Sequence, residues 1–136
     1  MLYNPTPLKG RGTEYFYNCP NHIKLILLQK NKPIGFIHIS FSPQKSFCEL
    51  SGGLIPNYIN SGLGIYASCF VLKYLFSRNP NIRIKAVTSD TNTRSERMLK
   101  KLGFNTSSTK DRLKILDCTI SSFNNTFIDY LLSRIN

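Results

Sequence analysis

The sequence predicts an α/β domain built on a mixed, mostly antiparallel β-sheet flanked by helices. Two apolar runs joined by a turn, residues 23–29 and 34–41, predict a β-hairpin. An amphipathic segment over residues 63–78 predicts a long helix, and the alternating residues 82–87 directly after it predict another strand. A strand, a helix and a second strand in this order form a crossover in which the two strands run parallel.

The composition suits a single domain over residues 1–136. The chain is 41% hydrophobic, which is enough for one core. No apolar run approaches the length of about 18 residues that a membrane-spanning helix needs. The first residues lack the charged start and apolar centre of a secretory signal, so we expect a cytoplasmic protein with no membrane partner. The four cysteines form no Cys-x-x-Cys pair, so we expect neither a metal site nor a disulfide framework.

The charge is strongly positive. Lysine and arginine outnumber aspartate and glutamate by 18 to 7, which gives a net charge of +11 and predicts either anionic partners or a solvated basic surface. Most aromatic residues fall on apolar faces, whereas a surface for single-stranded nucleic acid needs exposed aromatics between the charges. One helical stripe either faces solvent, contacts phosphates or binds an acidic partner such as RNA. It consists of Arg94, Arg97, Lys100 and Lys101.

The first third of the chain predicts an irregular arm followed by strands. Residues 1–22 are rich in proline, asparagine and glycine and predict an irregular N-terminal arm, with a short strand at residues 15–17. A third strand follows the hairpin over residues 46–55, and it contains Gly52 and Gly53. Two adjacent glycines inside a strand indicate either a bulge or the close approach of another backbone.

Two helices and a final strand are expected after it. Asn79 and Pro80 end the long helix, and a second helix over residues 93–101 stops at Gly103 in the C′ position. Polar residues after Phe104 predict a turn, and residues 112–120 predict the final strand. The apolar face of the long helix consists of Leu63, Tyr66, Ala67, Phe70, Val71, Tyr74 and Leu75. A closing helix is predicted by the spacing of Phe123, Phe127, Leu131 and Ile135.

The segment that joins the third strand to the long helix is suited to hold a phosphate. It runs from Pro56 through a polar turn to Gly62 and Gly64, where the helix starts. Two glycines let backbone N–H groups converge without side-chain obstruction, and the first turn of the helix adds unpaired donors and the positive end of its dipole. Anionic oxygens are therefore the expected ligand.

The order of these motifs resembles the acetyl-CoA-binding core of the GCN5-related N-acetyltransferase (GNAT) superfamily. The Asn-x-x-Ser motif before Leu-Gly-Phe is most similar to the branch that resembles ribosomal-protein N-terminal acetyltransferases. The resemblance covers residues 34–105, the acetyl-CoA-binding core, which is roughly half of the chain. The matching positions are Pro56, Tyr58, Gly62, Gly64, Asn92, Ser95, Leu102, Gly103 and Phe104.

The resemblance implies acetyl-CoA as cosubstrate and a sheet whose two central parallel strands splay apart. It implies acetyl transfer to a primary amine of a small molecule, a protein N-terminus or a lysine, with the Leu54 N–H against the thioester carbonyl. Asn92 would hydrogen-bond the pantetheine arm or cap the second helix, and one role does not exclude the other. The expected coenzyme-binding residues are Leu54, Ile55, Asn60, Ser61, Gly62, Leu63, Gly64, Ile65, Asn92 and Arg97.

Two catalytic residues are expected. Many relatives place a tyrosine that protonates the departing thiolate where this chain has Leu99, so the resemblance implies Ser95 as the acid. The alternative for Ser95 is an ordinary serine of the first helical turn. Glu49, on the strand that leads into the turn, is expected either as the base for the amine or as a solvated strand residue.

Three other titratable side chains are weaker candidates. His38 either relays a proton near neutral pH or is a satisfied sheet residue. Asp117 is an alternative base near the end of the chain. His22, in a loop beside Pro20, is expected at the surface.

Three departures from the family pattern leave other functions open. Ile59 replaces a common arginine or glutamine, Leu99 removes the tyrosine, and residues 1–22 are too few for the two helices that usually wall the acceptor pocket. Either the pocket is open, or the arm or a partner subunit, as in a homodimer, completes it. The alternatives to an enzyme are a non-catalytic relative that binds coenzyme A or a partner, and a basic module for RNA or the ribosome.

Overall fold

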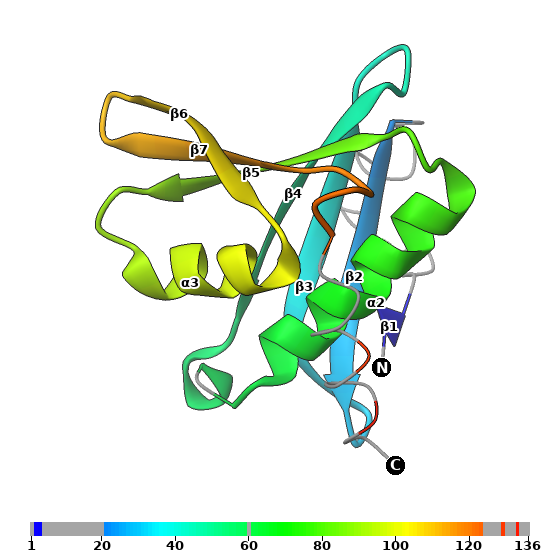
Figure 1. Cartoon of the computed structure of the whole chain (residues 1–136). Helices are drawn as coiled ribbons and strands as arrows, with labels where there is room; N and C mark the ends of the chain where they lie inside the picture. The colour runs from blue at the N-terminus through cyan, green and yellow to red at the C-terminus, as the bar shows by residue number, and fades with distance from the viewer. Residues whose placement is uncertain (1, 4–20, 60, 124–128, 130–132, 134–136) are drawn as a thin grey trace.

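The computed structural model describes residues 2–3, 21–59, 61–123, 129 and 133 (Figure 1). In this part of the chain one sheet has seven strands in the order β1-β2-β3-β4-β5-β7-β6. The strands are β1 (Leu2–Tyr3), β2 (His22–Gln29), β3 (Lys32–Phe41), β4 (Phe47–Leu54), β5 (Arg83–Ser89), β6 (Asn105–Lys110) and β7 (Leu113–Cys118). The helical elements are the 3-10 turn η1 (Pro56–Tyr58), α2 (Leu63–Arg78) and α3 (Thr93–Leu102).

β4 and β5 form the parallel pair, and the other neighbouring strands are antiparallel. Their pairing has three register positions and ends at Glu49 and Lys85. Beyond this point β4 continues to Leu54 against β3, and β5 continues to Ser89 against β7. The two strands therefore splay apart (Figure 1), which confirms the predicted mixed sheet with a splayed parallel pair.

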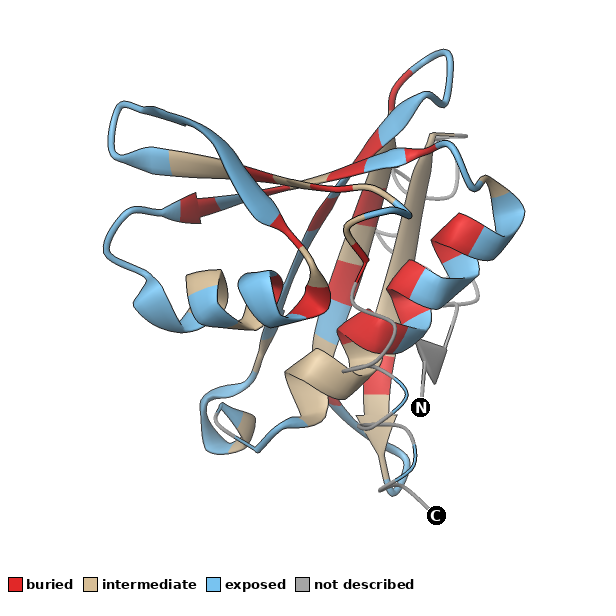
Figure 2. Cartoon of the chain, in the orientation of Figure 1, coloured by how far each residue is buried: buried red, intermediate tan, exposed pale blue. Residues whose placement is uncertain are grey.

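Both helices lie on one face of the sheet, and the core fills the space between (Figure 1). Figure 2 shows buried segments alternating with exposed ones along α2. Strand residues alternate between the two faces of a sheet, so every second residue of β3 and β5 points into this core. Among the almost fully buried side chains, the largest are Phe104, Ile39, Leu72, Ile84, Leu102 and Leu116.

The buried face of α2 differs from the predicted one. Phe70 and Tyr74, expected to face the core, are 46% and 49% exposed. Cys69, Leu72 and Phe76 are also apolar, so the helix is apolar almost all round and its sequence does not fix which side is buried. The buried residues are Ser68, Cys69, Val71, Leu72, Leu75 and Phe76.

The glycine pair in β4 marks a close backbone approach. The register between β3 and β4 runs without a shift through both glycines, so the alternative of a bulge at this place is wrong. A Cβ atom at Gly52 would lie 2.5 Å from the backbone oxygen of Phe36, whereas a Cβ atom at Gly53 would meet only the Phe36 ring at 3.7 Å. The register shift between β2 and β3 lies instead at Leu27 and Leu28.

The end of α3 is as predicted. Gly103 has a φ of 109°, in the left-handed region that a glycine C-cap favours. The N–H of Phe104 then donates to the Leu99 carbonyl at 3.0 Å. This reversal carries the chain from α3 into β6 and places Leu102 and Phe104 in the core.

The chain differs from the prediction after Phe104. The expected turn is wrong, because Asn105–Lys110 forms β6 and the turn to β7 lies at Asp111 and Arg112, both with positive φ. All six residues of β6 are exposed, so this edge strand carries no apolar alternation that a sequence pattern could reveal.

The two ends of the chain are described only in part. Leu2 and Tyr3, within the arm predicted as irregular, form β1 against Ile26 and Leu27. The strand expected at residues 15–17 lies outside the described residues. So does most of the closing helix, including three of its four predicted apolar positions, Phe127, Leu131 and Ile135.

A matched pair of substitutions tests the close approach at Gly52. Gly52→Ala is expected to lower the free energy of unfolding by about 1–3 kcal/mol, because the methyl group must displace the backbone of β3. Gly53→Ala is the control and should change it by less than about 0.5 kcal/mol. Urea unfolding measures both, and equal effects of the two substitutions would contradict this account of β4.

Candidate functional site

A cleft of about 680 Å³ lies where β4 and β5 separate. Residues 50–54 of β4 and 86–88 of β5 line its two walls, and the start of α2 and one side of α3 close it. The lining brings together six of the predicted coenzyme-binding residues and the predicted acid. These are Leu54, Gly62, Gly64, Ile65, Asn92 and Arg97, together with Ser95.

The glycine turn, which contains Gly62 and Gly64, lies at one end of the cleft, where α2 starts. Gly62 has a φ of 84° and is the N-cap residue. The Ser61 hydroxyl donates to the Tyr58 carbonyl at 2.6 Å and accepts from the Leu63 N–H at 3.2 Å, so it holds the turn together. Helix geometry leaves the next N–H groups, those of Gly64 and Ile65, without a partner in the helix. Asn60 lies outside the described residues.

Beyond Glu49, the edge of β4 presents backbone N–H groups to the cleft. The Ile55 N–H donates to the Ile34 carbonyl at 2.8 Å, on the β3 side. Because successive N–H groups of a strand point to opposite sides, those of Leu54 and Gly52 face the cleft. Ile55 itself is outside the lining, and its side chain is 44% exposed.

The start of α3 borders the cleft with polar groups. Asn92 caps the helix, since its Oδ1 accepts the Ser95 N–H at 3.2 Å, and Asn92 also lines the cleft. Ser95 lies beside it and is half-buried. Leu99, which stands where a tyrosine was expected, is 5% exposed and brings no hydroxyl to the lining.

The basic stripe of α3 divides into two sides. Arg94, Arg97 and Lys101 line the cleft, although the sequence singled out only Arg97 for the coenzyme. Lys100 instead donates to Glu96 at 3.0 Å. The hydrogen bond from Lys114, followed by that from Lys100, lowers the pKa of the Glu96 carboxyl.

Glu49 lies at the point where the two strands separate. It is exposed, opposite Ser40 of β3 and Lys85 of β5. Its side chain is outside the lining of the cleft, although Leu50 and Ser51, the next two residues of β4, belong to it. Asp117 pairs with Lys85 in register, and its Oδ2 lies 3.9 Å from a guanidinium nitrogen of Arg83. It is also outside the lining of the cleft.

His22 and His38 form a pair. The rings stack with centroids 5.0 Å apart, and Nδ1 of His22 is 2.8 Å from Nε2 of His38. His22 is the first residue of β2 and is half-buried, so its placement in a surface loop was wrong. Burial first, and then the charges of His22 and Lys24, lower the pKa of His38, against the opposite effect of Glu49.

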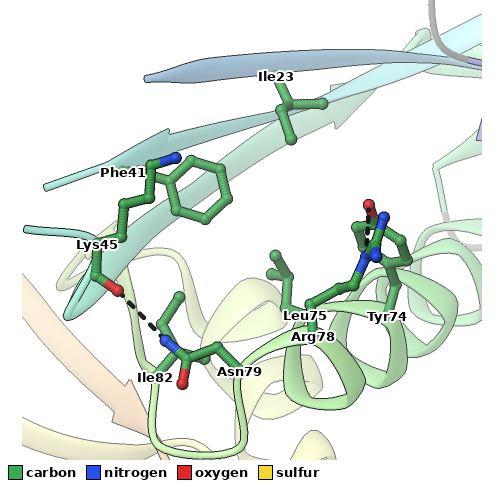
Figure 3. A pocket seen from close by; sticks show the side chains of 8 residues that line it. All are labelled: Ile23, Phe41, Lys45, Tyr74, Leu75, Arg78, Asn79 and Ile82. Carbon is green, nitrogen blue, oxygen red and sulfur yellow. Dashed lines mark hydrogen bonds between the residues drawn. The ribbon is translucent and has the colours of Figure 1, made fainter. Parts of the chain in front are cut away.

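A smaller pocket of about 270 Å³ shares no lining residue with the cleft (Figure 3). Apolar side chains of β2, β3 and α2 form part of it, and the Arg78 guanidinium lies 5.4 Å from the centre of the Tyr74 ring. The Asn79 side chain donates to the Lys45 carbonyl at 3.4 Å. None of the predicted site residues lines this pocket.

The three cysteines in the described part of the chain are buried, which disfavours the reactive thiolate form. Burial raises the pKa of Cys48 to about 12, and it raises the pKa values of Cys69 and Cys118 to about 11. Cys19 lies outside the described residues. Within the described part of the chain, no three His, Cys, Asp or Glu side chains are grouped so that they could hold a metal ion. No helix there is long and apolar enough to cross a bilayer.

Comparison with known families decides the assignment. Residues 9–105 match the acetyltransferase (GNAT) domain. The chain belongs to the GNAT family. A search of curated proteins finds no significant sequence match to this chain.

Solved structures share the GNAT fold at low sequence identity. Ribosomal-protein-S5-alanine acetyltransferase from Vibrio fischeri has a TM-score of 0.70 and 16% identity, over 83% of this chain and 69% of its own. The Campylobacter jejuni N-acetyltransferase PseH in complex with acetyl coenzyme A has a TM-score of 0.69 and 16% identity, over 79% and 74%. An F149A mutant of spermidine N-acetyltransferase SpeG from Vibrio cholerae has a TM-score of 0.71 and 14% identity, over 83% and 74%.

The His22–His38 pair makes a prediction about pH. The unfolded histidine titrates near pH 6.5, and His38 has a lower pKa in the folded protein, so the folded state binds fewer protons below pH 6.5. The free energy of unfolding should therefore be steady well above pH 6.5 and fall as the pH drops through 6.5 toward 5. Urea unfolding at pH 7, 6 and 5 measures this.

His38→Gln is expected to reduce that fall, because it removes the titrating group. Glu96 adds little to this fall, because its pKa is lowered in the folded protein and its stabilising effect is lost mainly near and below the unfolded value of 4.5. If the free energy of unfolding of His38→Gln falls with pH as much as that of the parent, another titrating group causes the fall.

Proposed function

We propose that the chain is an acetyl-CoA-dependent N-acetyltransferase of the cytoplasm, with residues 1–136 as one domain. The observation that carries the proposal is the cleft between β4 and β5, which ends at the glycine turn before α2. It offers backbone donors for phosphate at one end and an extended strand edge for a pantetheine arm along its length.

The coenzyme would bind along the cleft with its phosphates at the turn. The N–H groups of Gly64 and Ile65 would hold pyrophosphate oxygens, and the Gly62 backbone, free of a side chain, would let them approach. Arg94, Arg97 and Lys101 would add positive charge to the cleft. These three cations would compensate for Ile59, which is 43% exposed and brings no charge to the lining.

The reaction would be a direct attack of the amine nitrogen on the thioester carbonyl carbon. Glu49 would accept a proton from the amine, directly or through water, and the N–H of Leu54 would stabilise the oxyanion. Ser95 would donate a proton to the thiolate as the carbon–sulfur bond breaks. Asn92 would position the arm while its side chain caps α3.

An amine is the proposed acceptor. Two of the similar structures carry names that specify their acceptors, spermidine for one and an alanine of ribosomal protein S5 for the other. Both acceptors offer nitrogen nucleophiles, which supports an amine. The ribosomal-protein branch, a homodimer that completes the acceptor pocket, and contact with RNA or the ribosome remain predictions.

A non-catalytic coenzyme A-binding module is the second candidate. The buried Leu99 favours it, because the described lining of the cleft contains no tyrosine, the residue that many relatives use as an acid. Binding and turnover must therefore be measured separately.

The glycine turn is tested by two substitutions of nearly equal shape. Acetyl-CoA is expected to raise the parental melting temperature by mass action. Gly62→Asp should abolish that rise, because it places a negative charge where phosphate binds. Gly62→Asn is the control, since asparagine tolerates a positive φ and is uncharged, so it should keep most of the rise. No rise in the parent at millimolar acetyl-CoA would exclude both candidate functions.

Turnover tests the catalytic assignments. With spermidine and an N-terminal alanine peptide as acceptors, Ser95→Ala should lower the rate at least about tenfold, at the lower limit for acid–base catalysis, with coenzyme affinity nearly unchanged. Glu49→Gln should mainly flatten the rise of the rate with pH. Parental rates in both variants would refute the two assignments. Coenzyme binding without transfer to either acceptor would favour the non-catalytic module.

A further inference from the structure

The cleft also opens on the face of the sheet away from α2 and α3, which we call the outer face. Side chains alternate between the two faces along a strand. On β5 the lining contains Ala86 and Thr88, which are buried toward the helices, and between them Val87, which is 42% exposed. On β4 the exposed residues Ser51 and Gly53 line the cleft at the outer face. The start of α2 and one side of α3 close the cleft on the other face, so an acceptor enters from the outer face.

An aromatic ring borders this outer opening. Phe36 of β3 is in register with Gly53, and it lines the cleft. A Cβ atom at Gly53 would lie 3.7 Å from a carbon of the Phe36 ring, so the ring lies over the glycine at the edge of β4. Phe36 is 41% exposed. Two exposed apolar side chains, Phe36 and Val87, therefore line opposite walls of the opening, where a ligand would remove them from water.

Few carboxylates are near the opening. The described strands of the sheet carry two, Glu49 and Asp117, and Asp117 already lies 3.9 Å from a guanidinium nitrogen of Arg83. Lys85 lies in register between the two carboxylates. Glu49 is therefore left for the ammonium form of one amine. A polyamine would bring further ammonium groups beside Lys85, with no carboxylate of these strands left to pair with them.

The proposed reacting centre lies next to the Phe36 ring. Gly53, which the ring covers, directly precedes Leu54, whose N–H is the proposed donor to the oxyanion. A group attached to the attacking nitrogen would therefore lie within reach of Phe36 on one wall and Val87 on the other. An apolar group gains free energy when these side chains remove it from water, whereas a charged group does not.

We propose that the acceptor is an amine with an apolar group close to its nitrogen, and that Phe36 and Val87 determine this specificity. The proposal rests on the proposed function and names the class of its acceptor. The nitrogen reaches the thioester between the strands, while the apolar group stays at the outer face between the two side chains. Polyamines and small polar amines are then poor acceptors.

The test compares acceptors that differ in the group next to the amine. Alanyl-leucine amide and alanyl-asparagine amide differ in one side chain of nearly equal shape, and 3-methylbutylamine and ethanolamine form a pair of small molecules. Within each pair that is acetylated, kcat/KM should favour the apolar member about threefold to tenfold, as expected for partial burial of one aliphatic group. Spermidine should be a poorer acceptor than the apolar member of that pair.

Three variants test the two side chains. Phe36→Ala should lower the apolar preference to about twofold or less, because it removes one apolar wall. Val87→Thr, which keeps the shape and replaces a methyl group by a hydroxyl, should lower it as well. Phe70→Ala is the control, since Phe70 is comparably exposed but lies on α2 outside the lining, so the preference should not change. A rise of the melting temperature with acetyl-CoA equal to that of the parent shows that each variant keeps its fold.

The outcomes separate this inference from the proposed function. A parent that acetylates amines without the apolar preference, or with spermidine as the best acceptor, would overturn the inference alone. An equal loss of rate with both members of a pair in Phe36→Ala would also overturn it, since the ring would then not act on specificity. Acetyl-CoA binding without transfer to any of these acceptors would overturn the proposed catalytic function, and this inference with it.

Discussion

The short parallel pairing between β4 and β5 determines the rest of the site. Each strand keeps a full partner on its outer side, β3 for one and β7 for the other, so the sheet tolerates the loss of pairing beyond Glu49. The open edge of β4 presents backbone donors that water or a ligand must satisfy. α2 starts beside this opening, and the chain returns along β5 on its other side. One interruption in a ladder thus creates the cleft, its polar edge and the place of its phosphate end.

One close backbone contact and two glycines with left-handed backbone conformations position the strands and helices around this opening. Gly52 lets β4 lie tightly on β3, so the strand edge rather than side chains forms the wall. Gly62 reverses the chain directly before α2, and Gly103 does the same after α3. The backbone at Gly52 and Gly62 therefore shapes part of the cleft, and large side chains such as Leu50, Ile65 and Arg97 line the rest.

Local signals explain what the sequence could predict. The hairpin, α2, β5 and the glycine end of α3 follow from alternation, helical spacing and cap chemistry, and they place Gly62, Gly64, Asn92 and Ser95 at the cleft. β6 was missed because both of its faces are exposed. His22 was misplaced because its partner His38 is 16 residues away in sequence. The Phe36 ring over the edge of β4 becomes visible only when neighbours are known in three dimensions.

The three paired positions between β4 and β5 also divide the sheet into two antiparallel halves, β1 to β4 and β5 to β7. Each half has its own antiparallel ladder, and within the sheet the two halves are joined only by the three paired positions of β4 and β5. The distance between the two strand walls of the cleft therefore follows from the angle at which the two half-sheets diverge. An extended ligand that pairs with the open edges of both β4 and β5 would join the two half-sheets beyond Glu49 and Lys85 into one continuous sheet.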